Sequence, residues 1–202
     1  MTMGDEQGRA TRDDQDARAM RRICDGDDAG LAELYDRYAP MAMGLALRIT
    51  RDELEAQDVV HDAFVAVVER AEQYRVERGS VVAWLVATVR NLSLDRMRRR
   101  TRRGQITEEE LRHEPPEVVA DPEHMTVVEQ QRLAVRRALE KLPRSQRETL
   151  EVAFFEGLSY PEIAERQNIP LGTVKSRAAR ALTALRGALT DEALPPLPDE
   201  PD

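Results

Sequence analysis

The segment GLSYPEIAERQNIPLGTVKSRAARAL, residues 157–182, predicts two short helices joined by a tight turn. Ser159 can cap the first helix, and Glu162 stands three residues later, where its side chain can reach back to complete a capping box. We expect that helix to span about residues 160–166. Asn168 tolerates the left-handed backbone conformation that a turn between helices requires. The segment therefore favours a fold built from helices.

The second helix of this segment has an apolar side and a polar side. Its apolar side would carry Val174, Ala178, Ala181 and Leu185, which recur at helical spacing. Hydroxyl and guanidinium groups near the N-terminal half of such a helix are what reading of base edges in the major groove requires. The pattern predicts a DNA-binding helix-turn-helix, and the alternative is a helical hairpin with a charged solvent face. The predicted DNA-binding residues are Thr173, Lys175, Ser176, Arg177 and Arg180.

A second polar stripe lies in the middle of the chain and leads into an arginine cluster. Residues 90–103 contain seven arginines and one acidic residue, Asp95. Trp84 stands beside polar groups, and a lone tryptophan in such a position is by itself more often a core residue that its neighbours half cover. Followed by RMRRRTRR, it fits a surface that binds a nucleic-acid strand, with arginines on phosphates and flat groups stacked on bases. The predicted strand-binding residues are Trp84, Thr88, Asn91, Asp95, Arg98 and Arg99.

Asp58, His61 and Asp62 stand at i, i+3 and i+4 and would share one helix face. Such a trio could be mistaken for a metal or acid–base cluster. No further His or Cys is placed by the sequence to complete a ligand shell, so we expect neither a metal site nor a cofactor. A helix surface that faces solvent or a partner is the favoured interpretation.

Apolar periodicity divides the chain into two helical pieces, because no alternation typical of strands persists anywhere. We predict an all-α protein with two small helical domains joined by a flexible acidic linker that is rich in proline. One helix is expected over about residues 54–74, and Ser80 should cap the next. The predicted divisions are a polar acidic tail (1–26), a first domain (27–103), the linker (104–126), a second domain (127–189) and an acidic proline-rich tail (190–202).

The composition of the 202 residues is that of an ordinary globular protein, with a formal net charge of −8. Cys24 is the single cysteine and cannot form an intramolecular disulfide, which favours a reducing compartment. The N-terminal residues have no apolar core typical of a signal peptide, and no stretch approaches a membrane span. We therefore expect a cytoplasmic protein.

Both domains together resemble a bacterial sigma factor of the sigma-70 family, in its compact extracytoplasmic-function (ECF) group. EAQDVVHDAFVAVVERAEQY followed by VVAWLVATVRNLSLDRMRRR is similar to the family's region 2. LEKLPRSQRETLEVAFFEGLSYPEIAERQNIPLGTVKSRAARAL is similar to its region 4. Two motifs in the expected order and with the expected gap are much more specific than either motif alone.

The resemblance implies transcription initiation and no catalysis. Region 2 would melt the −10 element of a promoter with the strand-binding residues above, and the loop YRVERGS would hold a flipped base. Region 4 would read the −35 element through the helix-turn-helix. Asp58, His61 and Asp62 match the patch that docks on the clamp helices of the largest subunit of core RNA polymerase, and the flap of the second-largest subunit is a further partner. The resemblance also implies an anti-sigma factor.

Two other classes of protein stay open at this point. One is a stand-alone helix-turn-helix regulator that binds an operator as a dimer. The other is a nucleic-acid hydrolase that uses Asp58 and Asp62 to hold a divalent metal. The order of charges along the chain adds one hypothesis, namely that the acidic linker and tails compete with phosphate for the arginines.

Overall fold

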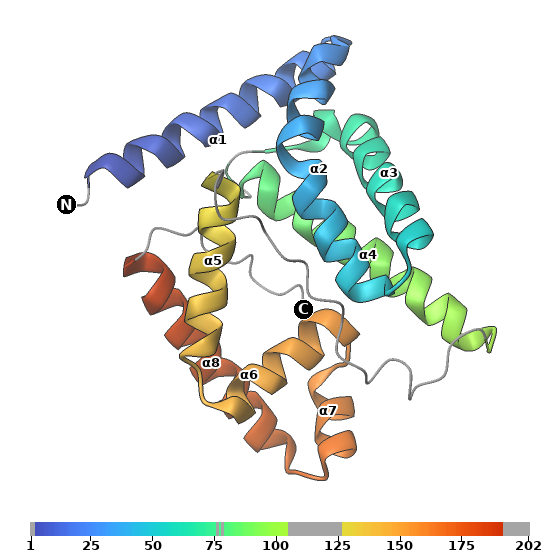
Figure 1. Ribbon diagram of the computed structural model, residues 1–202, viewed down its shortest axis with the longest axis vertical. Helices are drawn as coiled ribbons and strands as arrows, with labels where there is room; N and C mark the ends of the chain where they lie inside the picture. Colours follow the sequence, from blue (N-terminus) through green and yellow to red (C-terminus); the bar gives the residue numbers. More distant parts are fainter. Residues whose placement is uncertain (1–2, 76, 78, 105–126, 192–202) are drawn as a thin grey trace. The chain divides into compact units, whose positions relative to one another are not determined.

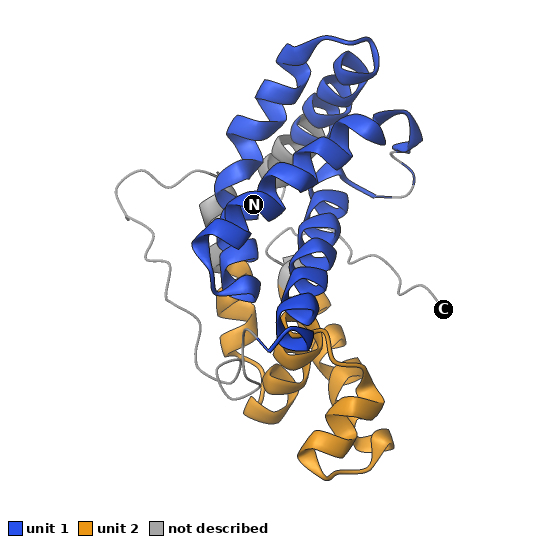
Figure 2. Ribbon diagram, turned by 90° about the vertical axis from the view of Figure 1, so that its right-hand side faces the viewer, with its two compact units in different colours: residues 1–118, 197–202 blue, residues 119–196 orange. Residues whose placement is uncertain are grey.

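The computed structural model describes residues 3–75, 77, 79–104 and 127–191, and it divides into two compact units (Figure 2). Within those ranges the regular elements are all helical and no strand occurs, which confirms the predicted fold class (Figure 1). The predicted linker beyond residue 104 and the C-terminal tail beyond residue 191 lie outside the described residues. The hypothesis that their acidic residues compete with phosphate for the arginines therefore stays a prediction.

Three capped helices follow an N-terminal helix in the first unit. Side-chain oxygens of Asp27, Asp52 and Ser80 accept backbone N–H groups of the helices that follow them, at 3.0, 3.1 and 3.3 Å. These caps satisfy amide groups that have no partner within the helix. The elements are α1 (Met3–Cys24), α2 (Asp28–Thr50), α3 (Glu53–Glu69), the short 3-10 helix η1 (Ala71–Gln73) and α4 (Val81–Arg102).

The core of the first unit lies where α2, α3 and α4 meet. Tyr38, Leu34, Val59 and Leu85 are each at most 1% exposed. The helix predicted over residues 54–74 is interrupted, because α3 ends at Glu69 and the chain turns into η1. Ala71 at this turn is buried against the same core.

The N-terminal segment differs from the predicted polar tail of residues 1–26, because most of it is the helix α1. Ala19, Met20 and Ile23 of this helix are buried in the core of the first unit. Gly30 of α2 makes the close approach possible, since a Cβ there would lie 2.5 Å from the carbonyl oxygen of Ala19. The first domain therefore begins before residue 27. The helix escaped prediction because its few apolar residues are outnumbered by charged ones.

The second unit contains the predicted helix-turn-helix. Its elements are α5 (Val127–Glu140), α6 (Arg144–Glu151), the π-helical turn η5 (Val152–Glu156), α7 (Tyr160–Gln167) and α8 (Leu171–Asp191). Gly157 and Asn168 take left-handed conformations, with φ of 66° and 51°. Ser159 and Glu162 form the complete capping box. The local prediction for this segment is confirmed, and α7 extends one residue beyond the predicted end.

Candidate DNA and partner interfaces

A small apolar cluster holds α8 against α7 in the second unit. Ile163 and Val174 are fully buried, and Ile169 of the turn packs against them. An ion pair between Arg166 and Glu156 ties the end of α7 to the turn that precedes it. Further along α8, Ala181 and Leu185 pack against residues of α5 and the segment that follows it. The predicted apolar side of α8 is thus the buried side, which leaves its polar side outward.

The predicted base-reading residues differ in how freely they are presented. Lys175 and Arg180 are exposed, whereas Thr173, Ser176 and Arg177 are partly buried. The Ser176 hydroxyl donates a hydrogen bond to the Thr173 carbonyl oxygen at 3.0 Å. Arg177 Nη1 lies 3.5 Å from Gln167 Oε1, which guides its guanidinium toward the end of α7. The structure therefore gathers all five on the first three turns of one helix, with Lys175 and Arg180 the two that are exposed.

The predicted strand-binding stripe runs along α4. Trp84 is half-buried, with its ring 6.4 Å from that of Tyr74, and Thr88 donates a hydrogen bond to the Trp84 carbonyl oxygen at 2.9 Å. Asn91 is exposed. Asp95 is engaged within the helix by Arg99, at 2.6 Å. The stripe thus combines an anchored aromatic ring at its start with polar groups toward its C-terminal half.

The arginines of α4 fall into two groups that the sequence does not separate. Arg98, Arg99 and Arg102 are exposed, as is Arg103 at the C-terminal cap of the helix. Arg96 and Arg100 instead turn toward α3, and Arg100 pairs at 3.2 Å with Asp52, which caps that helix. Burial, with a contribution from nearby Arg98, lowers the pKa of Arg90 below its ordinary value. The inward group is thus already paired with carboxylates of α3 and of the residue that precedes it.

Arg96 is the centre of an ion-pair cluster between α3 and α4. Its Nη1 lies 3.0 Å from a carboxylate oxygen of Glu55 and 3.0 Å from one of Asp58, and its Nη2 lies 2.7 Å from one of Asp62. Partial burial acts to lower the pKa of Arg96, but the hydrogen bonds to the three carboxylates outweigh it and raise that pKa above its ordinary value. We call these four residues the Arg96 cluster.

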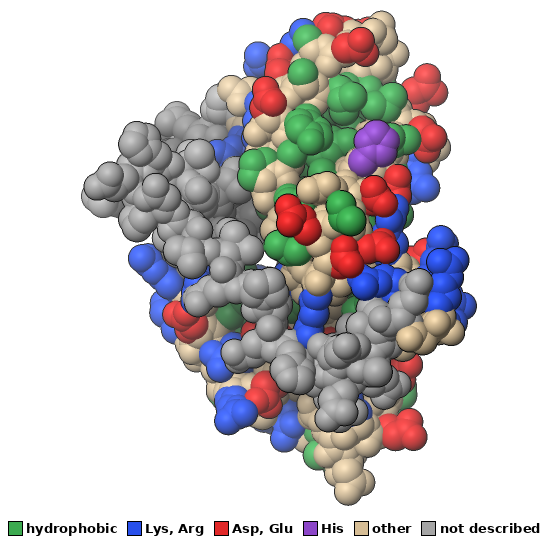
Figure 3. Space-filling view, turned by 45° about the vertical axis from the view of Figure 1, so that its right-hand side comes forward, with side chains coloured by type: hydrophobic (Ala, Val, Ile, Leu, Met, Phe, Trp, Pro, Cys, Tyr) green, Lys and Arg blue, Asp and Glu red, His purple; other side chains and the backbone are tan. Residues whose placement is uncertain are grey.

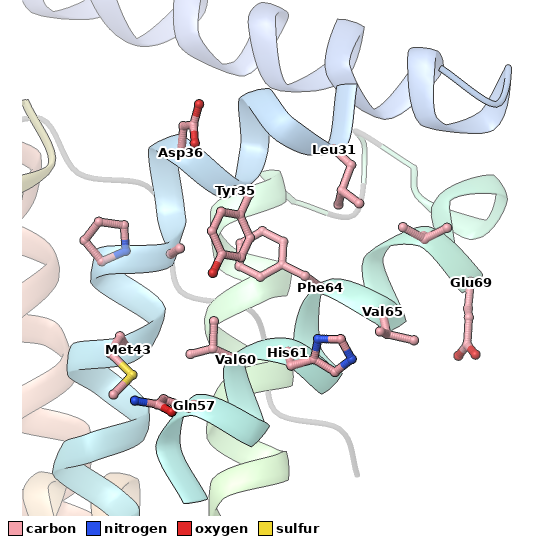
Figure 4. Close-up of a pocket in the computed structure, with 13 residues that line it drawn as sticks. Leu31, Tyr35, Asp36, Met43, Gln57, Val60, His61, Phe64, Val65 and Glu69 are labelled. Atoms are coloured by element: carbon pink, nitrogen blue, oxygen red, sulfur yellow. The ribbon is translucent and has the colours of Figure 1, made fainter. Parts of the chain in front are cut away.

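His61 lies apart from this cluster, although the sequence places it between Asp58 and Asp62. It lines an apolar groove of about 760 Å³ between α2 and α3 (Figure 4). Tyr35 and Phe64 pack there with ring centroids 4.8 Å apart, and Val65 and Val68 are 40% and 46% exposed. Figure 3 shows this apolar surface beside the histidine, with acidic side chains along its border.

Sequence reasoning missed this groove. The apolar residues of this helix, Val68 among them, follow one another as a single wide apolar face, and such a face is normally assigned to the core. The width of the apolar face was the signal that could have predicted the groove, because α3 carries more apolar residues than one buried stripe needs. Apolar side chains that remain exposed together in this way are typical of a surface that binds a partner.

The described residues contain no group of three or more His, Cys, Asp or Glu side chains that could hold a metal ion. In the same part of the chain, no helix combines the length and apolar character needed to cross a membrane.

Comparison with known proteins identifies two family segments. The model of Sigma-70 region 2 matches residues 34–103, and that of Sigma-70, region 4 matches residues 132–185. The helix α1 precedes the first matched segment. The ECF RNA polymerase sigma factor RpoE of Cereibacter sphaeroides is 34% identical over 170 residues, covering 83% of this chain and 91% of the relative. The ECF RNA polymerase sigma factor SigK of Mycobacterium tuberculosis is 31% identical over 177 residues, covering 84% and 91%.

Solved structures show a more distant likeness. Rhodobacter sphaeroides SigE, in complex with the anti-sigma ChrR, is 28% identical, with a TM-score of 0.44 and coverage of 86% of this chain and 97% of that one. CnrH, in complex with the cytosolic domain of CnrY, is 22% identical, with a TM-score of 0.39 and coverage of 89% and 99%.

Proposed function

Because the chain belongs to the ECF group of sigma-70 family RNA polymerase sigma factors, we propose a division of promoter recognition between its two units. The protein is a transcription initiation factor that binds core RNA polymerase and directs it to specific promoters. The observation that carries this function is the order of the two matched segments, one in each unit.

The second unit reads the −35 element through α8. Thr173, Lys175, Ser176, Arg177 and Arg180 form its base-facing and phosphate-facing side. The exposed guanidinium of Arg180 suits a bidentate contact with a guanine edge or a phosphate. Arg177 reaches the same groove of the DNA once it gives up its 3.5 Å contact with the amide oxygen of Gln167. Losing this contact costs little, because it is long and the Gln167 side chain carries no charge.

The first unit binds the melted −10 strand along α4. Trp84 offers a flat face, Asn91 a hydrogen-bonding amide, and Arg98 a cation for phosphate. Thr88 and Arg99 complete the stripe, with Asp95 holding Arg99 at 2.6 Å until phosphate competes for it. Electrostatic attraction to the phosphates supplies affinity, whereas stacking and hydrogen bonds to unpaired bases supply selectivity.

Core polymerase docks on the groove between α2 and α3 and on its acidic border. The groove offers apolar contact through Val65 and Val68, and His61 stands at its edge. Asp58 and Asp62, 69% and 46% exposed at their side chains, are presented beside it. An apolar centre with a charged rim is the usual anatomy of a protein interface. The clamp helices of the largest subunit would occupy it, and the flap of the second-largest subunit would hold the second unit.

Three coarser properties accompany this function. Sigma factors are transcription factors and not enzymes, and we extend this to a lack of any catalytic activity in this chain. We place the protein in the cytoplasm, where core polymerase and promoter DNA are found. An anti-sigma factor is proposed as a further partner, because the family resemblance implies one.

Run-off transcription tests the function as a whole. Core polymerase would be assayed on a library of promoter fragments with the protein, without it, and with Arg180→Ala or Arg144→Ala. Both variants remove one arginine charge from the second unit, but Arg144 lies on α6, outside the helix-turn-helix. We expect initiation that depends on the protein, weakens in Arg180→Ala and persists in Arg144→Ala. Sequence-specific binding by the protein alone, with no effect on core polymerase, would instead indicate a stand-alone regulator.

A matched pair of substitutions tests the docking groove. Val65→Lys places a charge in the groove, whereas Leu54→Lys places the same charge on the same helix at a residue that is 74% exposed and outside the groove. Affinity for core polymerase can be followed by anisotropy of a fluorophore on Cys24, which is exposed and is the single cysteine. We expect Val65→Lys to weaken binding strongly and Leu54→Lys to change it little. Equal effects would exclude the groove as the docking site.

A further inference from the structure

The Arg96 cluster joins two surfaces to which the proposed function gives different partners. Asp58 and Asp62 belong to the polymerase-facing side of α3, and Arg96 belongs to the DNA-binding helix α4. The contacts span 34 to 41 residues of sequence, so they exist only because the two helices pack together. An internal cation thus already holds the carboxylates offered to the polymerase.

The contacts of Arg96 are unequal in exposure. Its own side chain is 25% exposed and Glu55 is 31% exposed, while Asp62 and Asp58 are 46% and 69% exposed. The pair with Glu55 is therefore the inner part of the cluster, and the pairs with the two aspartates are the outer part. Water and an incoming partner reach the outer pairs first. A partner's cation can replace Arg96 at Asp58 and Asp62 while Arg96 remains anchored by Glu55.

We propose that Arg96 is an internal competitor that weakens the affinity of the α3 surface for core polymerase. This inference rests on the proposed docking role of Asp58 and Asp62. A cation about 3 Å from a carboxylate cancels much of the field that would attract a second cation. A partner must then replace hydrogen bonds that Arg96 already makes, so the net gain from its own ion pairs is reduced. Arg96 acts here as a positioning residue, since it acts through the aspartates.

The competition also supplies selectivity. The Arg96 guanidinium already pairs with three carboxylates, and a partner with scattered positive charges cannot make ion pairs strong enough to displace it. A partner that places cations at the outer aspartates and apolar side chains in the neighbouring groove can gain enough contact to displace it. The cluster therefore favours partners that engage both parts of the surface, which is how specificity against weaker competitors is built.

Arg100 provides a matched control on the same helix. It turns toward α3 as Arg96 does and is equally buried, but it pairs with Asp52 at 3.2 Å and with neither Asp58 nor Asp62. Arg100→Gln removes the same charge from the same interface and leaves the outer aspartates paired. A difference between Arg96→Gln and Arg100→Gln therefore isolates competition at Asp58 and Asp62 from a change in net charge.

The experiment measures affinity for core polymerase with the full-length chain labelled at Cys24, at low and at physiological salt. We expect Arg96→Gln to bind about two- to fivefold more tightly than the wild type, the range that exposed ion pairs support. Arg100→Gln should change affinity by less than about twofold. The gain in Arg96→Gln should shrink as salt rises, because screening weakens both the competitor and the attraction. Arg96→Lys, which keeps the charge but loses the fork, should lie between the wild type and Arg96→Gln.

The same variants in an Asp58→Asn, Asp62→Asn background decide the mechanism. If Arg96 competes for these aspartates, Arg96→Gln has no effect on affinity in that background. Weaker binding by Arg96→Gln, an equal gain in Arg100→Gln, or a gain that survives in the double-Asn background would overturn the inference. Failure of the proposed docking role is a separate result, in which the two Asn substitutions leave wild-type affinity unchanged. If Arg96→Gln does not fold, Arg96→Lys in both backgrounds carries the same comparison.

Discussion

Gly30 and Gly44 lie on the same helix, α2, and should respond in opposite directions to the same substitution. A Cβ at Gly30 would lie 2.5 Å from the Ala19 carbonyl oxygen and 2.9 Å from the Arg22 Cβ. A Cβ at Gly44 would meet nothing within 4 Å. Gly30→Ala therefore forces α1 away from α2, whereas Gly44→Ala adds a methyl group in open space.

The expected magnitudes follow from two opposing effects. Replacing glycine by alanine inside a helix contributes roughly 0.5–1 kcal/mol of stability. Forcing an extra carbon into a close-packed contact costs about 1–3 kcal/mol, and here the obstacle is backbone that cannot rotate aside. We expect Gly30→Ala to lose about 0.5–2 kcal/mol of unfolding free energy, or roughly 2–16 °C in Tm, while Gly44→Ala gains up to about 1 kcal/mol.

Trp84 makes the assay specific to the first unit. It is the single tryptophan of the chain and packs against the core that α1 helps to bury. Urea unfolding followed by its fluorescence therefore reports on that unit alone. If Gly30→Ala proved as stable as Gly44→Ala, the close packing of α1 on α2 would be wrong, and with it the extension of the first domain before residue 27.

Three further substitutions test the caps, a buried carboxylate and the strand-binding surface. Ser159→Ala should cost the second unit about 1 kcal/mol through loss of the cap, seen as faster amide hydrogen exchange in α7. Burial raises the pKa of Asp16, although Tyr38 and Arg37 partly oppose it. The folded state therefore holds this proton more tightly than the unfolded state, so stability falls as pH rises from about 4 through the folded pKa. In Asp16→Asn the urea midpoint of unfolding should decline less steeply with pH than in the wild type. An unchanged slope of the midpoint against pH would contradict this prediction. Arg98→Ala in the complex with polymerase should weaken binding to a single-stranded −10 oligonucleotide, whereas Arg21→Ala, which removes the same charge from α1, should not.

Sequence reasoning succeeded where local chemistry determines the structure. The turn of the helix-turn-helix needs only a capping residue, a carboxylate three positions later and a residue that tolerates positive φ, and all three stand within ten residues. The Ser80 cap of α4 was predicted for the same reason. These signals require no knowledge of what the helices pack against.

The failures concern features that only tertiary packing creates. α1 has few apolar residues, and its burial depends on a glycine in α2 that lets the two backbones approach. Arg96 and Arg98 are two residues apart in one basic run, yet one turns toward α3 and the other is exposed. Periodicity alone could place them on different faces, but it could not say which face meets a row of carboxylates.

The packing of α3 on α4 also bears on how an acidic chain can carry a basic helix. Three carboxylates of α3 pair with Arg96, and the carboxylate of Asp52, the residue before α3, pairs with Arg100. The inner side of α4 is therefore neutralised within the first unit. On the proposed function the outer arginines are the ones that meet phosphate, and screening over about 8 Å at physiological salt limits what distant acidic residues can cancel. Basic and acidic groups are therefore separated by helix face as well as along the sequence. A net charge of −8 is then compatible with a basic surface, because the field that a phosphate meets is set by the face it approaches.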